Sequence, residues 1–396
     1  MMRVYLDHNA GAPIRPAARA AMARCVEAEA GNPASVHRGG QKARRRLEEA
    51  REQVAAMVDA RPETIVFTSG GTEANNLAIF GAVRAAGPRR RIVTAAHEHS
   101  SILAPVAELE SRGFAVTTIA PDRDGRIDPN AVADALDDRT ALVTLGLANA
   151  EVGAIQPVAP IAEAARRAGA TFHLDAAQAA GRMRLAVGAL GCDLMTLSAH
   201  KLGGPAGCGA LYCATGARTA PLLMGGPQER GMRAGTPNLI GAVGFGAAAA
   251  EVIGALATES ARISSLSAIL LDALVGAIPG LELNGPRADR IGNTLNFTFP
   301  GVLGESLLMA LDLEGVEVSM GSACAAGAVE PSHVLTAMGR AADAARSSLR
   351  ISLGWSTTAE EIAYAAATIA CVWRRVASAE PIVAPVADGG AGEAAR

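Results

Sequence analysis

The order in which short apolar runs and Ala-rich stretches follow one another restricts the fold of this chain more than any other feature. Between residues 64 and 213, short runs of β-branched or apolar residues alternate with segments of helical character. Such alternation is typical of a mostly parallel sheet with helices on both faces. We expect strands at 64–68, 91–95, 115–119, 141–145, 171–174, 194–197 and 209–213, and helices at 73–86, 101–111, 129–136 and 158–168.

Beyond residue 213 the pattern changes. A long helical region is expected at 239–274, followed by strand-like segments at 293–299, 316–319 and 350–352 and by helices at 305–313, 331–338 and 359–376. The chain has 396 residues, more than a single hydrophobic core usually serves. We predict a large domain at 16–258, a smaller α/β C-terminal domain at 259–377 with the segment 1–15 packed against it, and a flexible tail at 378–396.

Charge and cysteine content exclude several kinds of partner. The 36 basic and 39 acidic residues leave no positive field to attract a phosphate backbone, so we expect no nucleic acid partner. Six cysteines without a CxxC pair predict neither a zinc site nor a disulfide framework, and favour a reducing cytoplasm. The apolar stretch at 241–257 is interrupted by Glu251 and predicts a buried helix rather than a membrane span. The first residues, MMRVYLDHNA, lack the basic and apolar pattern of a secretory leader, so we do not expect secretion. The Arg- and Glu-rich block at 44–52 predicts a solvated helix face.

Only two of the basic residues are lysines, Lys42 and Lys201. Lys201 ends the sequence Ser198-Ala199-His200-Lys201, which follows an expected strand, and ligands of parallel sheets collect at the carboxyl ends of strands. A partly desolvated lysine loses its proton well below its reference pKa of about 10.4 and can form an imine with an aldehyde. An arginine stays protonated and cannot replace it.

Three other strand ends carry polar groups. The turn at 69–72 (SGGT) opens a helix, and its amides and hydroxyls could bind a phosphate, although a simple turn with an N-cap would look the same. Asp175 follows the strand at 171–174, where an isolated Asp often only caps the next helix. His97-Glu98-His99 follows the strand at 91–95. A metal there would need further ligands that do not stand nearby, so the alternative is a ring, with His99 nearer the following helix, that stacks on a planar cofactor.

Lys201, Asp175 and the turn at 69–72 together form the set that pyridoxal phosphate requires. The lysine binds the aldehyde, and the turn binds the phosphate. The aspartate keeps the ring nitrogen protonated, so the ring can accept electrons from a substrate carbanion. We therefore predict pyridoxal 5′-phosphate as the cofactor and no intrinsic metal.

On these residues the chain resembles the cysteine desulfurases of the NifS/IscS group, which are class V aminotransferase-like, fold-type I pyridoxal phosphate enzymes. The matching motifs run almost from end to end: 5–10 (YLDHNA), 31–37 (GNPASVH), 67–76 (FTSGGTEANN), 149–153 (NAEVG), 175–178 (DAAQ), 198–201 (SAHK) and 233–236 (RAGT). The resemblance implies an α/β fold with a mostly parallel seven-stranded sheet and a smaller C-terminal domain. It also implies a homodimer.

The resemblance assigns a role to each residue of the site. Lys201 would carry the cofactor and remove the substrate proton, Asp175 would bind the ring nitrogen, and His99 would stack on the ring and help to manage protons. The other cofactor contacts would come from Asn149 beside the ring, Gln178 near O3′, the phosphate-binding Gly71, Thr72, Ser198 and His200, and Thr236 of a second subunit. Arg350, on a strand, would bind the substrate carboxylate through two parallel hydrogen bonds, with Asn32 assisting.

Cys324 lies within a run of small residues at 321–327 (GSACAAG). Such a run cannot build a core, so we expect a mobile loop whose one reactive group is a thiol. By the resemblance, Cys324 attacks the sulfur of L-cysteine, keeps it as a persulfide and passes it to an acceptor such as an iron–sulfur scaffold. The same thiol could serve as a transient iron–sulfur ligand. Gly11-Ala12 and Ala325-Ala326 depart from the family pattern, where Thr or Ser is common, but neither removes a group that the chemistry needs.

Three alternatives to a cysteine desulfurase stay open from the sequence. A class V aminotransferase would share Lys201, Asp175 and the phosphate turn but would not need Cys324. A selenocysteine lyase would use nearly the same residues. A non-enzymatic sulfur-carrier scaffold is disfavoured because no chemical group is missing. The sequence does not distinguish iron–sulfur assembly, nitrogenase maturation and tRNA thiolation as the destination of the sulfur.

Overall fold

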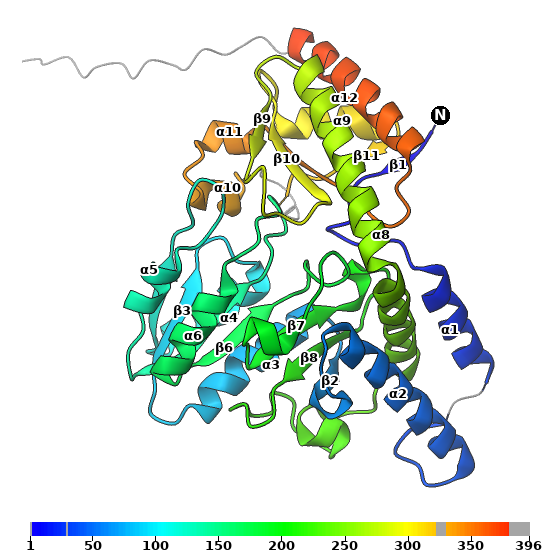
Figure 1. The fold of residues 1–396 in the computed structure, drawn as a ribbon, viewed down its shortest axis with the longest axis vertical. Helices are drawn as coiled ribbons and strands as arrows, with labels where there is room; N and C mark the ends of the chain where they lie inside the picture. Colours follow the sequence, from blue (N-terminus) through cyan, green and yellow to red (C-terminus); the bar gives the residue numbers. More distant parts are fainter. Residues whose placement is uncertain (1, 29–30, 322–329, 380–396) are drawn as a thin grey trace, which may run out of the picture.

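The large domain is built on a seven-stranded sheet (Figure 1), seen in a computed structural model that describes residues 2–28, 31–321 and 330–379. Its strands lie in the order β2-β8-β7-β6-β5-β3-β4, and β8 alone runs antiparallel to its neighbours. Their bounds are β2 Ile65–Thr68, β3 Arg91–Ala95, β4 Ala115–Ile119, β5 Thr140–Gly146, β6 Thr171–Asp175, β7 Leu194–Ser198 and β8 Gly209–Cys213. The mostly parallel sheet expected from the sequence is thereby confirmed.

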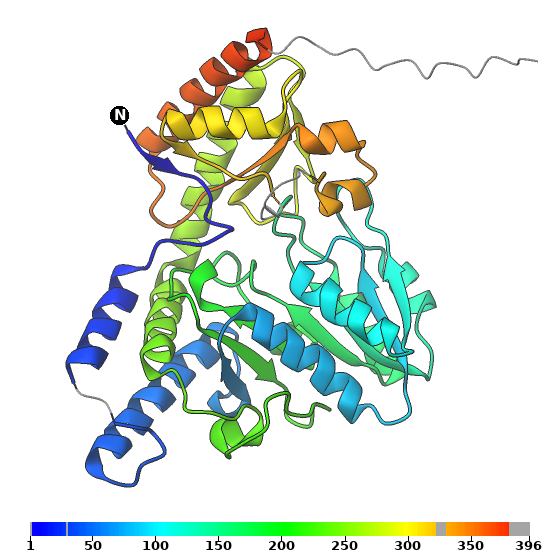
Figure 2. The same ribbon diagram turned by 180° about the vertical axis from the view of Figure 1, so that it is seen from behind.

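Alternation along the strands gives the sheet two apolar faces. On β2, Phe67 packs into one core together with residues of α2 (Arg38–Met57), α6 (Val158–Ala168) and α8 (Leu239–Ala277). Val66, one position earlier, packs into a second core with α3 (Gly71–Ala85) and α4 (Ser100–Ser111). Figure 2 shows α3 and α4, in blue to cyan, in front of the sheet. The domain also contains α1 (Pro16–Glu27), α5 (Pro129–Asp134) and α7 (Val187–Leu190).

The small domain has its own sheet and its own apolar core. Its antiparallel strands lie in the order β12-β10-β9, and β1 from the N-terminus pairs in parallel with β11. The strands are β1 Val4–Tyr5, β9 Glu282–Asn284, β10 Thr294–Thr298, β11 Val316–Glu317 and β12 Ser348–Ser352. The helices are α9 Gly304–Leu313, α10 His333–Ala337, α11 Ala342–Arg346 and α12 Ala359–Ala379. Residues 378 and 379 thus belong to α12, and the rest of the expected tail lies outside the described residues.

Helix α8 links the two domains (Figure 1). Phe245 and Val252 pack in the core of the large domain, and Leu266 and Leu274 pack in the core of the small domain. The boundary expected after residue 258 therefore lies inside one continuous helix. Because each half of α8 belongs to a different core, the helix fixes how the two sheets lie relative to each other.

Helix α8 is also long and apolar enough to cross a membrane, judged by length and composition only. Half of its most apolar window is buried against other parts of the chain, and it packs on α1 and α2. Glu251, within that window, accepts hydrogen bonds from Arg15 Nη1 at 3.1 Å and from the backbone N–H of Ala17 at 3.2 Å. Core helices of folded domains give the same signal.

The Arg- and Glu-rich block at 44–52 is not a fully solvated face. Arg51 is only 2% exposed, and its guanidinium makes two hydrogen bonds to Glu229, at 2.7 and 2.8 Å. Its Cζ also lies 4.9 Å from the centre of the Phe67 ring. The expectation was wrong at this position because the acid that pairs with Arg51 lies far away in the sequence.

Candidate active site

The polar residues expected at strand ends come together at one edge of the large sheet. His99 follows β3, Asp175 ends β6 and Lys201 follows β7. These strands belong to the same sheet and run in the same direction. The N-terminal segment 5–12 crosses this edge: the backbone N–H of Ala12 donates to the carbonyl of His200 at 2.8 Å. The site is therefore closed on one side by residues that precede the first helix.

Lys201 is held by the N-terminal segment. Its Nζ donates to the backbone carbonyls of Asn9 at 2.6 Å and Ala10 at 2.9 Å. Burial first, and then the positive charges of Arg182 and Arg350, lower the pKa of Lys201 to about 8, although Asp7 and Asp175 oppose the shift. The amine is consequently neutral in a useful fraction of molecules near neutral pH.

The carboxylate of Asp175 is fixed by two donors. Oδ1 accepts from the backbone N–H of Ala177 at 2.9 Å, and Oδ2 accepts from Asn75 Nδ2 at 2.7 Å. The same Asn75 Nδ2 donates to Ser101 Oγ at 2.7 Å. A carboxylate with both oxygens held is suited to pair with a cationic ring nitrogen.

His99 caps helix α4 through Nδ1, which accepts from the backbone N–H of Ser101 at 3.1 Å and lies 2.7 Å from Ser101 Oγ. The pKa of His99 is lowered mainly by burial, and Asp175 opposes this shift. His97 points elsewhere: its Nε2 lies 3.3 Å from Gln156 Nε2, and burial lowers its pKa to about 4. Within the described residues no group of three or more His, Cys, Asp or Glu is arranged to hold a metal ion.

The expected phosphate residues lie together. Ser198 Oγ is 3.0 Å from His200 Nδ1. A Cβ placed on Gly71 would lie 3.3 Å from Ser198 Cβ, so the start of α3 touches the end of β7. Helix α3 begins at Gly71 without a side-chain cap, which leaves its first amides for a ligand. Thr72 follows in the first turn and is exposed.

Asn149 and Gln178 border this edge through bonds within the chain. Asn149 Oδ1 accepts from the backbone N–H of Glu151 at 2.8 Å, and its Nδ2 donates to the carbonyl of His97 at 3.2 Å. Gln178 Nε2 donates to the carbonyl of Asn9 at 3.0 Å, and its Oε1 accepts from Arg182 Nη1 at 2.7 Å. Both amides therefore have fixed orientations.

Arg350 enters the site from the small domain. It lies on β12, is 4% exposed, and its Nη2 donates to Asp7 Oδ1 at 2.6 Å. Nη1 has only long contacts of 3.4 Å to the carbonyls of Ala150 and Gly321, and Nε is buried without a partner among the described residues. A buried guanidinium with unused donors is a binding group for a carboxylate.

A family model described as Aminotransferase class-V matches residues 4–364. The chain is 42% identical over 362 residues to "Cysteine desulfurase IscS" of Dictyoglomus turgidum, covering 91% of this chain and 92% of that protein. Among solved structures, "NIFS-LIKE PROTEIN" matches with a TM-score of 0.89 and 32% identity, covering 94% of this chain and all of that one. "SspA in complex with cysteine" matches with a TM-score of 0.79 and 32% identity, over 88% and 98% of the two chains.

The chain belongs to the cysteine desulfurases of the class-V aminotransferase family. Pyridoxal 5′-phosphate is accordingly its cofactor, as the sequence predicted. The comparisons favour a desulfurase over an aminotransferase or a non-enzymatic scaffold. The Dictyoglomus turgidum relative is named a cysteine desulfurase, and the first of these structures is named NifS-like.

Three expected site residues are not brought to this edge within the described chain. Asn32 is exposed before α2, where its Oδ1 accepts from the backbone N–H of Ala34, and Figure 1 shows the start of α2 far from the small-domain sheet. Thr236 is exposed, and its expected contact is with a second subunit, so it stays a prediction. Cys324 lies outside the described residues.

The structure adds residues that the sequence reasoning did not single out. Asp7 pairs with Arg350, Arg182 orients Gln178, and Asn75 joins Asp175 to Ser101. Asp7 and Asn75 stand within matched motifs, at 5–10 and 67–76, and a closer look at the polar positions of those motifs could have found them. Arg182 carries no such signal.

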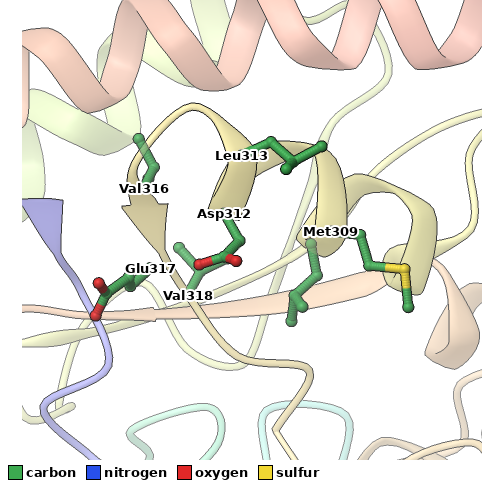
Figure 3. Close-up of a pocket in the computed structure, with 7 residues that line it drawn as sticks. Met309, Asp312, Leu313, Val316, Glu317 and Val318 are labelled. Atoms are coloured by element: carbon green, nitrogen blue, oxygen red, sulfur yellow. The ribbon is translucent and has the colours of Figure 1, made fainter. Parts of the chain in front are cut away.

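A pocket on the outer side of the small domain has no part in this chemistry. It lies between α9 and β11 (Figure 3) and is lined by Leu308, Met309, Asp312, Leu313, Val316, Glu317 and Val318. This lining holds no lysine, histidine or cysteine, and Glu317 is paired with Arg3 at 2.6 Å.

Proposed function

We propose that this desulfurase transfers the sulfur of L-cysteine to Cys324 as a persulfide, releases L-alanine, and passes the sulfur to an acceptor protein. The observation that carries the proposal is that Arg350 and Lys201 both bind the same short N-terminal segment. Arg350 binds Asp7, and Lys201 binds the carbonyls of Asn9 and Ala10. A carboxylate clamp and a base of lowered pKa therefore lie close enough to act on one small amino acid.

The residues present fit the cofactor. Lys201 offers a buried amine with a lowered pKa, Asp175 an oriented carboxylate, and the uncapped start of α3 with Ser198 and His200 a set of phosphate donors. Bound there, pyridoxal phosphate supplies an electron-accepting ring. Gln178 and His99 would make the remaining contacts from this chain, Asn149 would lie beside the ring, and Thr236 would come from a partner subunit.

The residues of the chain then divide the work on the substrate. Arg350 binds the α-carboxylate through its buried guanidinium, whose Nε has no partner among the described residues and whose Nη1 has only long contacts. Lys201 Nζ, once neutral, takes the α-proton. The Nε2 of His99 is available for proton transfer, because its Nδ1 is occupied by Ser101.

Cys324 accepts the sulfur. The thiolate forms an S–S bond to the substrate sulfur while the Cβ–S bond of the substrate breaks, and Cβ takes a proton. Cysteine and the enzyme thiol thus become alanine and the enzyme persulfide, with no external oxidant or reductant. The motif at 321–327 supports this role because Cys324 is its only reactive side chain.

The proposal extends to the setting of the reaction. We assign the chain to a homodimer in the cytoplasm that supplies sulfur for iron–sulfur assembly or other thio-cofactors. The free state of every described cysteine and the exposure of Thr236 support this setting. A chemical cross-linking measurement of Thr236→Cys homodimers would test the subunit contact.

Two variants and one control test the reaction. The wild type is expected to be yellow and to release equal amounts of alanine and sulfide from L-cysteine in the presence of a thiol reductant. Lys201→Ala should lose the colour and the activity, and Cys324→Ser should keep the colour but lose sulfur release. Cys371→Ser, at an exposed cysteine on α12, should behave as the wild type. Full turnover by Cys324→Ser would overturn the persulfide role. Turnover of selenocysteine without turnover of L-cysteine would favour the selenocysteine lyase.

A further inference from the structure

Helix α3 carries a buried polar side chain that the chemistry above does not use. Asn75 is 1% exposed, and its Nδ2 donates to Ser101 Oγ and to Asp175 Oδ2, both at 2.7 Å. We propose that Asn75 is a positioning residue that fixes Asp175 and, through Ser101, His99 in the orientations that the cofactor requires. This inference rests on the proposed function, since it concerns how the same site holds its cofactor.

The contact with Asp175 restrains its carboxylate. A hydrogen bond donated to a carboxylate oxygen holds the plane of the group. Ala177 already fixes Oδ1, so Asn75 supplies the second restraint, on Oδ2. With both restraints the carboxylate cannot rotate away from a ring nitrogen.

The contact with Ser101 continues to His99. The backbone N–H of Ser101 can only donate, so His99 Nδ1 must be an acceptor. Because Ser101 Oγ accepts the hydrogen of Asn75, its own hydrogen is free to point to Nδ1, 2.7 Å away. Asn75, Ser101 and His99 thus form one directed chain of hydrogen bonds that leaves the proton of the neutral imidazole on Nε2.

Packing alone does not account for an asparagine at this position. Asn75 Oδ1 is buried and has no partner among the described residues, which lowers stability compared with an apolar side chain of similar size. Rotating the amide by half a turn would place Oδ1 against the carboxylate of Asp175, so that orientation is excluded. What an asparagine supplies here, and an apolar side chain cannot, is the pair of hydrogen bonds donated to Ser101 and Asp175.

The test measures how tightly the apoprotein binds pyridoxal phosphate, by titration of the visible absorbance. Asn75→Ala should raise the Kd at least about tenfold, the effect of one hydrogen bond to a charged group. Asn75→Asp has nearly the same shape but should bind still more weakly, increasingly so as pH rises, because two carboxylates would stand 2.7 Å apart. Asn76→Ala is the matched control: Asn76 Nδ2 only donates to the carbonyl of Thr72 in its own helix, so the Kd should not change.

Thermal unfolding of each apoprotein separates positioning from folding. The expected signature is a raised Kd in the two Asn75 variants with a melting temperature near that of Asn76→Ala. Ser101→Ala leaves α3 intact and removes only the hydroxyl that joins Asn75 to His99, so it should raise the Kd by a smaller factor, about fivefold. Wild-type affinity in Asn75→Ala and Asn75→Asp, or in Ser101→Ala, would overturn the inference. A wild-type chain that binds no cofactor would instead overturn the proposed function.

Discussion

The lowered pKa of Lys201 depends on which groups surround its amine. Its Nζ binds two backbone carbonyls, and among the described residues no carboxylate makes an ion pair with it. Carbonyls stabilise an ammonium less than a carboxylate would, so burial and the nearby guanidinium groups determine the direction of the shift and lower the pKa to about 8. The other lysine, Lys42, is exposed on α2.

This pKa predicts how fast the apoprotein takes up its cofactor. Because only the neutral amine attacks the aldehyde, the rate constant of uptake should rise about tenfold per pH unit below pH 8 and level off above it. Stopped-flow absorbance after mixing with pyridoxal phosphate measures this rate. An increase that continues to about pH 10, as for an ordinary lysine, would contradict the account.

Glu98 predicts a pH dependence of stability. It is 5% exposed, its Oε2 accepts from the backbone N–H of Gly146 at 2.9 Å, and burial raises its pKa to about 8, with Asp175 adding to the shift. The folded chain therefore binds this proton more tightly than the unfolded chain, whose glutamates titrate near pH 4.5. The stabilisation is complete below that pH and is lost as pH rises through about 8.

The variant Glu98→Gln keeps an acceptor for Gly146 and cannot ionise. Its melting temperature should exceed that of the wild type above about pH 8, and the difference should shrink as pH falls towards 5. Calorimetric scans over this range provide the measurement. A difference that is the same at every pH would show that ionisation of Glu98 plays no part.

Among the elements, β8 constrains the phosphate site through a close contact with the turn before α3. A Cβ on Gly209 would lie 2.6 Å from the backbone carbon of Gly70 and 2.8 Å from the carbonyl oxygen of Leu197. Both neighbours are backbone and cannot move separately from the strands. The start of α3 is therefore held at its place by a glycine on another strand.

We predict that Gly209→Ala destabilises the fold by about 1–3 kcal/mol and weakens cofactor binding as well. Gly254→Ala is the control, since Gly254 lies on the exposed face of α8 with open space around a Cβ, and it should stabilise by about 0.5–1 kcal/mol. Urea unfolding of both variants provides the free energies. A Gly209→Ala protein as stable as the wild type would mean that the turn is free to move.

The sequence predicted the elements whose signal is local. Six of the seven strands of the large sheet are almost continuously buried, β4 at the edge is not, and all seven were predicted to within a residue at each end. Strands β1 and β9 were not predicted, because two or three residues are too few to show a period of two, whereas β11 was predicted at 316–319 and is shorter, Val316–Glu317. Strand β1 exists because β11, distant in the sequence, supplies its hydrogen bonds, and β9 because it pairs with the next strand, β10.

The site divides in the same way. Lys201 and Asp175 could be predicted because each follows a recognisable strand. The pair Asp7–Arg350 joins residues 343 positions apart, and Asn75 reaches Asp175 across 100 positions, so no local pattern announces either contact. Asn32 shows the converse: a matched motif does not by itself bring a residue to the site of its own chain.

At the scale of the whole molecule, two domains contribute different groups to one reaction. The large domain provides Lys201 and Asp175, and the small domain provides Arg350. The N-terminal segment connects them, because it pairs with β11 through β1, binds Arg350 through Asp7, and binds Lys201 through its carbonyls. Together with α8, it sets the distance between carboxylate clamp and base.

The central claim is that Cys324 carries the sulfur. One measurement tests it directly: the yellow wild-type protein, freed of reductant, is mixed with a limiting amount of L-cysteine, alkylated and digested for mass spectrometry. The account predicts one added sulfur atom on the peptide that contains Cys324, in proportion to the alanine formed. Alanine formed without sulfur on that peptide, or sulfur found only on another cysteine such as the exposed Cys371, would contradict it.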